Sequence, residues 1–127
     1  MTRTFLGPHV CGDSIQVVGD KLIVGSNHVK DQIYNFSLSM GNLISKETLD
    51  PPCAIYSIAT SKLDKGKYFA AVGSNSDRAY IVDTETLEVC STVKGYDSPI
   101  YGVDYANQTP YFCMGCEDGS IQLFRCK

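Results

Sequence analysis

The chain carries few residues of the types that attack substrates or bind metal ions, with two histidines and six cysteines among 127 residues. An enzyme that uses a nucleophilic side chain positions a serine, threonine or cysteine beside a base, which is often a histidine. Neither histidine of this chain, His9 or His28, lies in a nucleophile-elbow motif. The chain also lacks a phosphate-binding glycine loop and a metal-binding helix motif. We therefore expect a protein that is not an enzyme. The less favoured alternative is catalysis by carboxylates such as Asp13, Asp104 and Asp118, brought together by the fold.

The six cysteines lie within or beside segments of β-forming residues, where a small apolar side chain would serve equally well. We interpret them as reduced, structural residues of a cytosolic protein. Cys113 and Cys116 have the CxxC spacing of a tetrahedral zinc site, but such a site requires two more ligands. The sequence holds no second CxxC and no closely paired histidines, so the fold would have to bring in His9 and Cys11. We predict no metal and no cofactor.

Composition and charge are those of an ordinary globular chain, with 43% hydrophobic residues, 20% charged residues and a formal net charge of −3. The 11 basic residues are scattered, which disfavours a nucleic-acid partner because that affinity depends on clustered Lys and Arg. No apolar run approaches the roughly 20 residues that cross a bilayer, and the N-terminus lacks a signal-peptide core. We expect no membrane partner and a cytoplasmic location, with association with the cytoskeleton as an alternative.

One pattern recurs three times along the chain: a β-rich run, a pivot of small residues and a second β-rich run. The copies occupy residues 21–36, 67–83 and 111–124. Their pivot glycines, Gly25, Gly73 and Gly115, are 48 and 42 positions apart. This spacing agrees with the period of about 40 to 50 residues that is typical of propeller blades.

Each repeat, with its flanking residues, is expected to form one blade of four antiparallel strands. Turn signals such as Gly19-Asp20 separate the strands, and no sustained helical period occurs. We predict an all-β fold of about three β-propeller blades in a single domain, 1–127. The predicted blades are approximately 13–50, 54–94 and 98–127. The third repeat ends one strand short, and residues 2–7 are predicted to supply an outer strand that closes the last blade.

The repeats resemble those of the WD-repeat β-propeller family over nearly the whole chain. In that family a Gly-His pair precedes the first strand, a Gly-Ser pair follows the second, an aspartate lies in the next turn and a Trp-Asp pair ends the third. The Gly-Ser place is held by Gly25-Ser26, Gly73-Ser74 and Gly115-Cys116, and the Trp-Asp place by Tyr34-Asn35, Val82-Asp83 and Phe124-Arg125. The turn aspartates would be Asp31, Asp77 and Asp118, and Gly95-Tyr96 would hold the Gly-His place. Because no tryptophan occurs, the family's hydrogen-bond network should be incomplete, and blade packing should depend on apolar burial.

Three blades cannot enclose a central axis, since closed propellers have about four to eight. We therefore expect another subunit, a second copy of the chain or the rest of a longer chain to complete this partial or half propeller. The resemblance implies a rigid, non-catalytic platform for protein–protein interaction. The alternative is a structural component of a large cytoskeletal or ciliary assembly. In either case the expected partner is a protein, or the chain itself in a homo-oligomer.

The candidate binding residues lie in loops at equivalent places of the three repeats, together with two tyrosines near the rim. They are His28, Lys30, Asp31, Asp77, Arg78, Tyr96, Tyr101, Glu117 and Asp118. Tyrosine is frequent in interaction surfaces, but most tyrosines here fall within strand runs. We accordingly expect Tyr68 and Tyr111 in the core.

Overall fold

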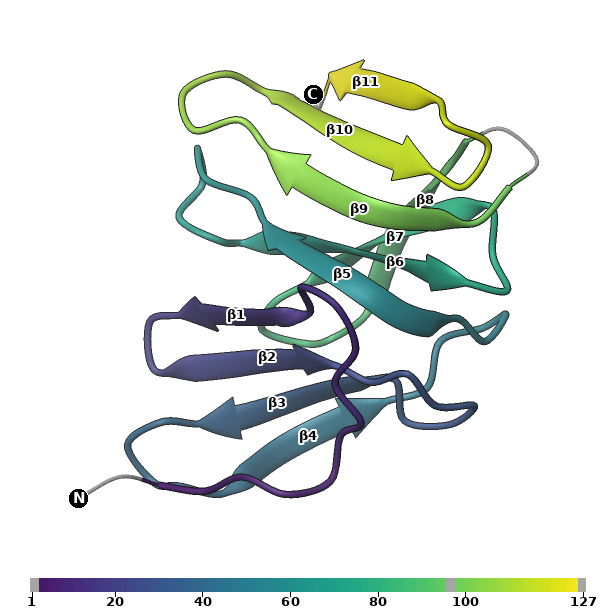
Figure 1. Cartoon of the computed structure of the whole chain (residues 1–127). Helices are drawn as coiled ribbons and strands as arrows, with labels where there is room; N and C mark the ends of the chain where they lie inside the picture. The colour runs from purple at the N-terminus through teal and green to yellow at the C-terminus, as the bar shows by residue number, and fades with distance from the viewer. Residues whose placement is uncertain (1–2, 96–97, 126–127) are drawn as a thin grey trace.

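The computed structural model describes residues 3–95 and 98–125 (Figure 1). All regular structure in these residues is β-strand, and the strands form three antiparallel sheets that stack one on the next. The all-β fold class predicted from the repeats is therefore confirmed. Within these ranges no helix is long and apolar enough to cross a membrane.

The first sheet contains β1 (Ile15–Val18), β2 (Lys21–Gly25), β3 (Ile33–Ser37) and β4 (Leu43–Glu47), in that order. In the turn that joins β1 to β2, Gly19 has a φ of 60°, which glycine adopts without steric cost. The next residue, Asp20, accepts hydrogen bonds from the Ser37 hydroxyl at 2.9 Å and from the Ser39 backbone at 2.8 Å. Hydrogen bonds from Ser39 and Ser37, the Ser39 side chain first, lower the pKa of Asp20 and tie the two turns of this edge together.

The second sheet contains β5 (Ala54–Thr60), β6 (Tyr68–Ser74), β7 (Arg78–Asp83) and β8 (Val89–Lys94), again in chain order. Residues 69–73 of β6 are all buried, as expected for an apolar run that has a sheet on each face. Asp83 fixes the turn after β7 because its carboxylate accepts hydrogen bonds from the backbone of Glu85 at 2.8 Å and of Thr86 at 3.0 Å. The bond from Thr86 contributes most to lowering the pKa of Asp83.

The third sheet contains β9 (Ile100–Tyr105), β10 (Tyr111–Cys116) and β11 (Ile121–Arg125). In the first two sheets the third strand pairs with a fourth strand, β4 or β8. In the described part of the third sheet, β11 pairs with β10 alone. Among the described residues, one edge of β11 therefore has no pairing strand.

Two apolar layers hold the three sheets together. The layer between the first and second sheets contains Ile23, Ile33, Leu49, Cys53, Ile55, Ile58, Phe69, Ala71, Tyr80, Val82 and Leu87. The layer between the second and third sheets contains Ala59, Ala70, Val72, Ala79, Ile100, Tyr105, Phe112 and Met114. Burial of apolar surface at about 25 cal/mol per Å² stabilises both interfaces without a tryptophan.

The prediction of a strand in residues 2–7 is wrong for the part that the structure describes, residues 3–7, which form no strand. The Phe5 ring instead packs on Phe36 of β3, with 5.0 Å between ring centroids, and the Arg3 guanidinium donates to the Ser39 carbonyl oxygen at 2.8 Å. The segment thus covers part of the outer face of the first sheet. It cannot reach β11 of its own chain, because that strand lies at the opposite end of the stack (Figure 1). Closure of a blade by this segment stays a prediction.

The strand register corrects the position assigned to the Trp-Asp pair in the first repeat. Phe36 pairs with Leu22 as Phe124 pairs with Phe112, three positions before Gly25 and Gly115 respectively. Phe36, and not Tyr34, therefore holds the structural place of Phe124. The longer loop before β3 concealed this shift in the sequence.

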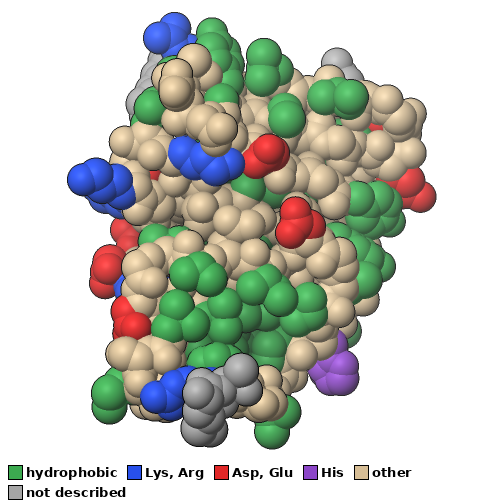
Figure 2. Space-filling model, turned by 60° about the vertical axis from the view of Figure 1, so that its left-hand side comes forward, with side chains coloured by type: hydrophobic (Ala, Val, Ile, Leu, Met, Phe, Trp, Pro, Cys, Tyr) green, Lys and Arg blue, Asp and Glu red, His purple; other side chains and the backbone are tan. Residues whose placement is uncertain are grey.

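The outer faces of the first and third sheets carry exposed apolar side chains. In the first sheet these are Ile15, Val17 and Leu43, and in the third sheet Tyr111, Ile121 and Leu123. Figure 2 shows hydrophobic side chains gathered on the lower half of the molecule, where the first sheet lies. The expectation that Tyr111 belongs to the core is wrong, since its side chain is exposed on a face of the third sheet against which no other described sheet packs. Tyr68 is half-buried.

Candidate interaction site

Three loops lie along one rim of the stack: those between β2 and β3, β6 and β7, and β10 and β11 (Figure 1). Each follows the second strand of its sheet, so the repeat itself places them on one side. Eight of the nine predicted binding residues belong to these loops or lie close to them. The ninth, Tyr96, lies outside the described residues.

In the first loop, the side chains of His28 and Lys30 are exposed. The His28 ring stacks on His9, with 5.3 Å between ring centroids, which holds the segment before β1 against the loop. Asp31 forms an ion pair of 3.2 Å with Lys46 of β4, and its backbone N–H donates to the Thr48 hydroxyl at 3.0 Å. Asp31 therefore fixes the loop to its own sheet, which leaves His28 and Lys30 as the side chains available to a partner.

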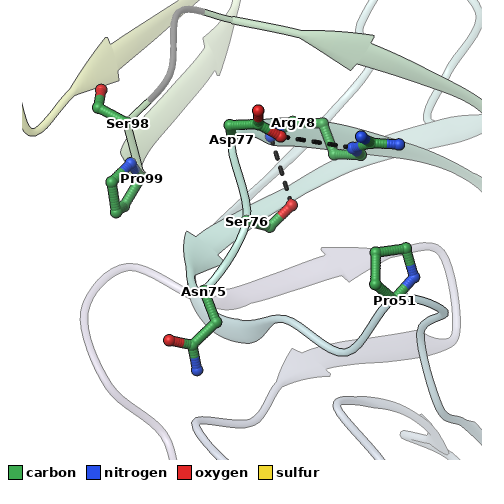
Figure 3. Close-up of a pocket in the computed structure, with 7 residues that line it drawn as sticks. All are labelled: Pro51, Asn75, Ser76, Asp77, Arg78, Ser98 and Pro99. Atoms are coloured by element: carbon green, nitrogen blue, oxygen red, sulfur yellow. Dashed lines mark hydrogen bonds and ion pairs between the residues drawn. The ribbon is translucent and has the colours of Figure 1, made fainter.

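In the second loop, Asp77 and Arg78 line a shallow pocket (Figure 3). Asp77 forms ion pairs with Arg78 at 3.5 Å and with Lys94 at 3.7 Å, and the Ser76 hydroxyl accepts a hydrogen bond from the Arg78 backbone at 3.3 Å. The pocket is lined by Pro51, Asn75, Ser76, Asp77, Arg78, Ser98 and Pro99, contributed by three separate segments of the chain. Its charged groups already neutralise one another, so it offers a partner shape and hydrogen bonds more than net charge.

In the third loop, the two acidic residues differ in what they do. Asp118 accepts hydrogen bonds from the backbone and hydroxyl groups of Ser120, at 2.9 Å and 2.6 Å, and these bonds lower the pKa of Asp118. Its carboxylate thus stabilises its own turn. Glu117 is anchored by its backbone N–H, which donates to the Pro99 carbonyl oxygen at 2.9 Å, and its side chain is exposed.

Tyr101 of β9 lies beside this third loop. Its ring packs edge-to-face against Tyr56 of β5, with 5.0 Å between centroids and 88° between ring planes. Burial, and next the negative charge of Glu117, raise the pKa of the Tyr101 hydroxyl. Of the predicted residues, the structure thus brings together Tyr101 with Glu117 and Asp77 with Arg78, whereas His28, Lys30 and Asp31 stay on their own loop.

The described residues contain no Ser–His, Thr–His or Cys–His pair of the kind that activates a nucleophile. No hydroxyl or thiol in residues 3–95 and 98–125 is hydrogen-bonded to an imidazole, and no group of three or more His, Cys, Asp or Glu side chains could hold a metal ion there. Five cysteines are free in these ranges, and burial raises the pKa of the Cys53 thiol to about 12. A thiol with such a pKa is a poor nucleophile near neutral pH.

Comparison with solved structures identifies the arrangement of the three sheets. The β-propeller domain of Cps50 (Swd1) from Myceliophthora thermophila matches 98% of this chain with a TM-score of 0.74 and 17% identity. The WD40 repeats of RRP9 match 94% of it with a TM-score of 0.78 and 16% identity. The three sheets are WD40-type propeller blades. U3-55K gives the same match as RRP9, with a TM-score of 0.78 over 94% of this chain.

The WD40-type blades of this chain are only a part of those propellers. The chain spans 38% of the length of the Cps50 domain and 37% of RRP9 and of U3-55K. No protein-family model and no curated protein matches the sequence. At 16 to 17% identity these similarities establish the fold alone.

The pocket and rim residues that sequence reasoning did not select are contributed by separate segments. Pro51, Ser98 and Pro99 come from the connections between sheets, and only the stacking of blades brings them beside Asp77. Tyr56 lies within the β-forming segment of β5, and nothing in the sequence indicated that its side chain lies at the rim. Its place depends on a β-bulge, which the sequence pattern did not indicate.

Proposed function

We propose that this chain is a non-catalytic protein-interaction scaffold, built from three WD40-type blades that another protein surface completes. The completing surface is another subunit, a second copy of the chain or the rest of a longer chain. The observation that carries the proposal concerns the third sheet: in the part of the chain that the structure describes, one of its faces exposes apolar side chains and one edge of β11 has no pairing strand. A soluble protein that leaves such a face and edge exposed would be prone to aggregate.

Two glycines indicate what kind of surface fits the third sheet. A Cβ atom on Gly25 would lie 2.3 Å from Ile55 Cγ2, so the absence of a side chain at this position allows the next sheet to approach. Gly115 holds the same place in the third sheet, and a Cβ there would meet nothing within 4 Å. Gly115 therefore leaves room for a residue like Ile55, as another blade would supply.

An apolar groove beside β11 supports the same proposal. It lies between the second and third sheets and has a volume of about 420 Å³. Its apolar lining includes Ile81 and Val93 from the second sheet and Phe112 and Phe124 from the third. A strand paired with the open edge of β11 would direct alternate side chains into this groove, as strand addition at a sheet edge does.

The alternative of a structural component in a large cytoskeletal or ciliary assembly requires the same completing surface. An enzyme is less favoured, because the histidines are stacked on each other at the rim. A cytoplasmic location stays a prediction of the sequence, and the free cysteines support it because disulfides are rare in that compartment. Microscopy of the tagged chain tests the location, and a secretory or organellar signal would contradict it.

Partner capture with matched surface variants tests the scaffold. The tagged chain is used as wild type, with Leu123→Asp on the bare face of the third sheet, and with Leu63→Asp in the turn between β5 and β6. Both leucines are exposed, at 67% and 57%, so neither substitution should unfold the chain. We expect Leu123→Asp to abolish capture and Leu63→Asp to preserve it. Equal capture by all three forms would contradict the proposal.

A further inference from the structure

We propose that Tyr56, Tyr101 and Glu117 form a binding site for a cationic side chain, an arginine or a lysine, presented by a partner peptide. The inference rests on the proposed scaffold function and names the chemistry that the rim would recognise. It depends on three observations: the backbone that places the rings, the packing of the rings, and the carboxylate beside them.

The backbone turns both tyrosines to the surface by the same irregularity. In the second sheet, Ile55 and Ser57 pair with the consecutive residues Gly73 and Val72, so a β-bulge leaves Tyr56 without a residue opposite. In the third sheet, the pairs Ile100–Cys116 and Gly102–Gly115 leave Tyr101 in the same position. Bulges redirect a side chain and are frequent next to functional sites.

The two bulges bring the rings together because β5 and β9, the first strands of their sheets, contact each other (Figure 1). The rings meet edge-to-face with 5.0 Å between centroids, which limits the freedom of both. Tyr101 nevertheless keeps 42% of its surface exposed. A restrained aromatic surface that stays accessible is what a cation requires to approach a π-face within about 6 Å.

Glu117 supplies negative charge to this corner. The other acidic residues predicted at the rim are engaged by their own sheets: Asp31 with Lys46, Asp77 with Arg78 and Lys94, and Asp118 with Ser120. Among the described residues, no Lys or Arg forms an ion pair with Glu117. Cys116 pairs with Ile100, and the Glu117 backbone N–H donates to the Pro99 carbonyl oxygen at 2.9 Å, so Glu117 lies beside the start of β9, which carries Tyr101.

These features select a cation over other ligands. A carboxylate beside the electron-rich faces of two tyrosines repels phosphate and carboxylate groups, and attracts a guanidinium or an ammonium. A guanidinium would stack on Tyr101 and bond the Glu117 carboxylate at the same time. An ammonium would use the same ring and carboxylate as a point charge.

The test is a titration followed by NMR of the whole chain with labelled tyrosine rings. The probes are three blocked peptides, Gly-Gly-Arg-Gly-Gly, Gly-Gly-Lys-Gly-Gly and the neutral Gly-Gly-Gln-Gly-Gly. We expect a cationic peptide to shift the ring signals of Tyr56 and Tyr101, with an affinity that falls as salt is added. Binding of both cationic peptides assigns a general cation site, and binding of the arginine peptide alone assigns a guanidinium site. Equal shifts with the glutamine peptide would overturn the inference, as would no shift with either cationic peptide.

Matched variants assign the binding to these residues. Tyr101→Leu should weaken it about 3- to 5-fold, whereas Tyr101→Phe keeps the aromatic face and should retain it. Glu117→Gln should weaken binding about 3-fold and remove most of its salt dependence, while Glu88→Gln, at another exposed glutamate, should change neither. Affinity that is unchanged in both Tyr101→Leu and Glu117→Gln would contradict the assignment.

This titration is independent of the scaffold proposal. If the peptides fail to bind while Leu123→Asp still abolishes partner capture, the cation site is wrong and the scaffold stands. If the peptides bind as described while no partner is captured, the cation site stands and the scaffold is wrong.

Discussion

The hydroxyl group of Tyr80 donates a 2.8 Å hydrogen bond to the carbonyl oxygen of Pro51. Tyr80 is a fully buried residue of β7, and Pro51 lies in the connection between the first two sheets. The bond therefore fixes the path of the chain from one blade to the next. Burial raises the pKa of the Tyr80 hydroxyl and keeps it protonated as a donor.

Tyr80→Phe should lower the free energy of unfolding by about 1 to 2 kcal/mol, because it leaves the Pro51 carbonyl oxygen without its donor. The control is Tyr68→Phe, since the Tyr68 hydroxyl has no hydrogen-bond partner among the described residues. Urea unfolding of the three forms measures the difference. Equal midpoints for Tyr80→Phe and the wild type would contradict the role of this bond.

Substitution of the two equivalent pivot glycines should have opposite effects. Gly25→Ala places a methyl group against Ile55 and should destabilise the isolated chain by about 1 to 3 kcal/mol. The methyl group of Gly115→Ala would meet no other atom within 4 Å, so this substitution should leave the stability of the isolated chain unchanged. In the completed assembly, however, Gly115→Ala should weaken association. Thermal unfolding and partner capture measure the two effects, and a strong loss of stability with Gly115→Ala alone would contradict the open face.

Stability in acid should depend on the turn aspartates. Asp20, Asp83 and Asp118 have lowered pKa values, so the folded chain binds protons less readily than the unfolded chain at these groups. Their contribution is present above the unfolded pKa, near 3.8, and is lost as the pH falls through the lowered folded values. Asp20→Asn should reduce stability at neutral pH and flatten its decline in acid, whereas Glu47→Gln should do neither. Unfolding midpoints of the three forms, measured from neutral pH down to below the unfolded pKa, test this prediction. Parallel curves of midpoint against pH for the wild type and Asp20→Asn would refute it.

The cysteines should differ sharply in reactivity. Cys53 is fully buried with a pKa of about 12, whereas Cys90 is exposed. We expect iodoacetamide to alkylate Cys90 rapidly and Cys53 only when the chain opens, so that denaturant accelerates the reaction of Cys53 alone. Peptide mass mapping over time follows both sites. Early modification of Cys53 in the folded chain would contradict its place in the core.

The sequence was sufficient to predict the strands and turns because local chemistry determines them. Gly19 provides the positive φ that its turn requires, and the apolar run of β6 is buried on both faces as its composition indicates. The candidate loops were predicted at one rim because each follows the second strand of its repeat, and equivalent loops of successive repeats lie on the same side. These features depend on residues that are close in sequence.

The features that sequence reasoning missed depend on contacts between blades. Tyr56 has the pattern of an ordinary strand residue, and only the bulges in β5 and β9 bring it against Tyr101, which the sequence had placed near the rim. Tyr111 alternates like a core residue but lies on a face of the third sheet that no other sheet in residues 3–95 and 98–125 covers. Residues 3–7 have the composition of a strand, but they form none. The Phe5 ring of this segment packs on Phe36 instead.

Sedimentation velocity of the isolated chain over a wide concentration range, with a hydrophobic dye in parallel, tests the central claim most directly. An incomplete propeller should self-associate as its concentration rises and bind the dye when dilute, and Leu123→Asp should reduce both. A stable, folded monomer at every concentration that binds no dye would contradict the account.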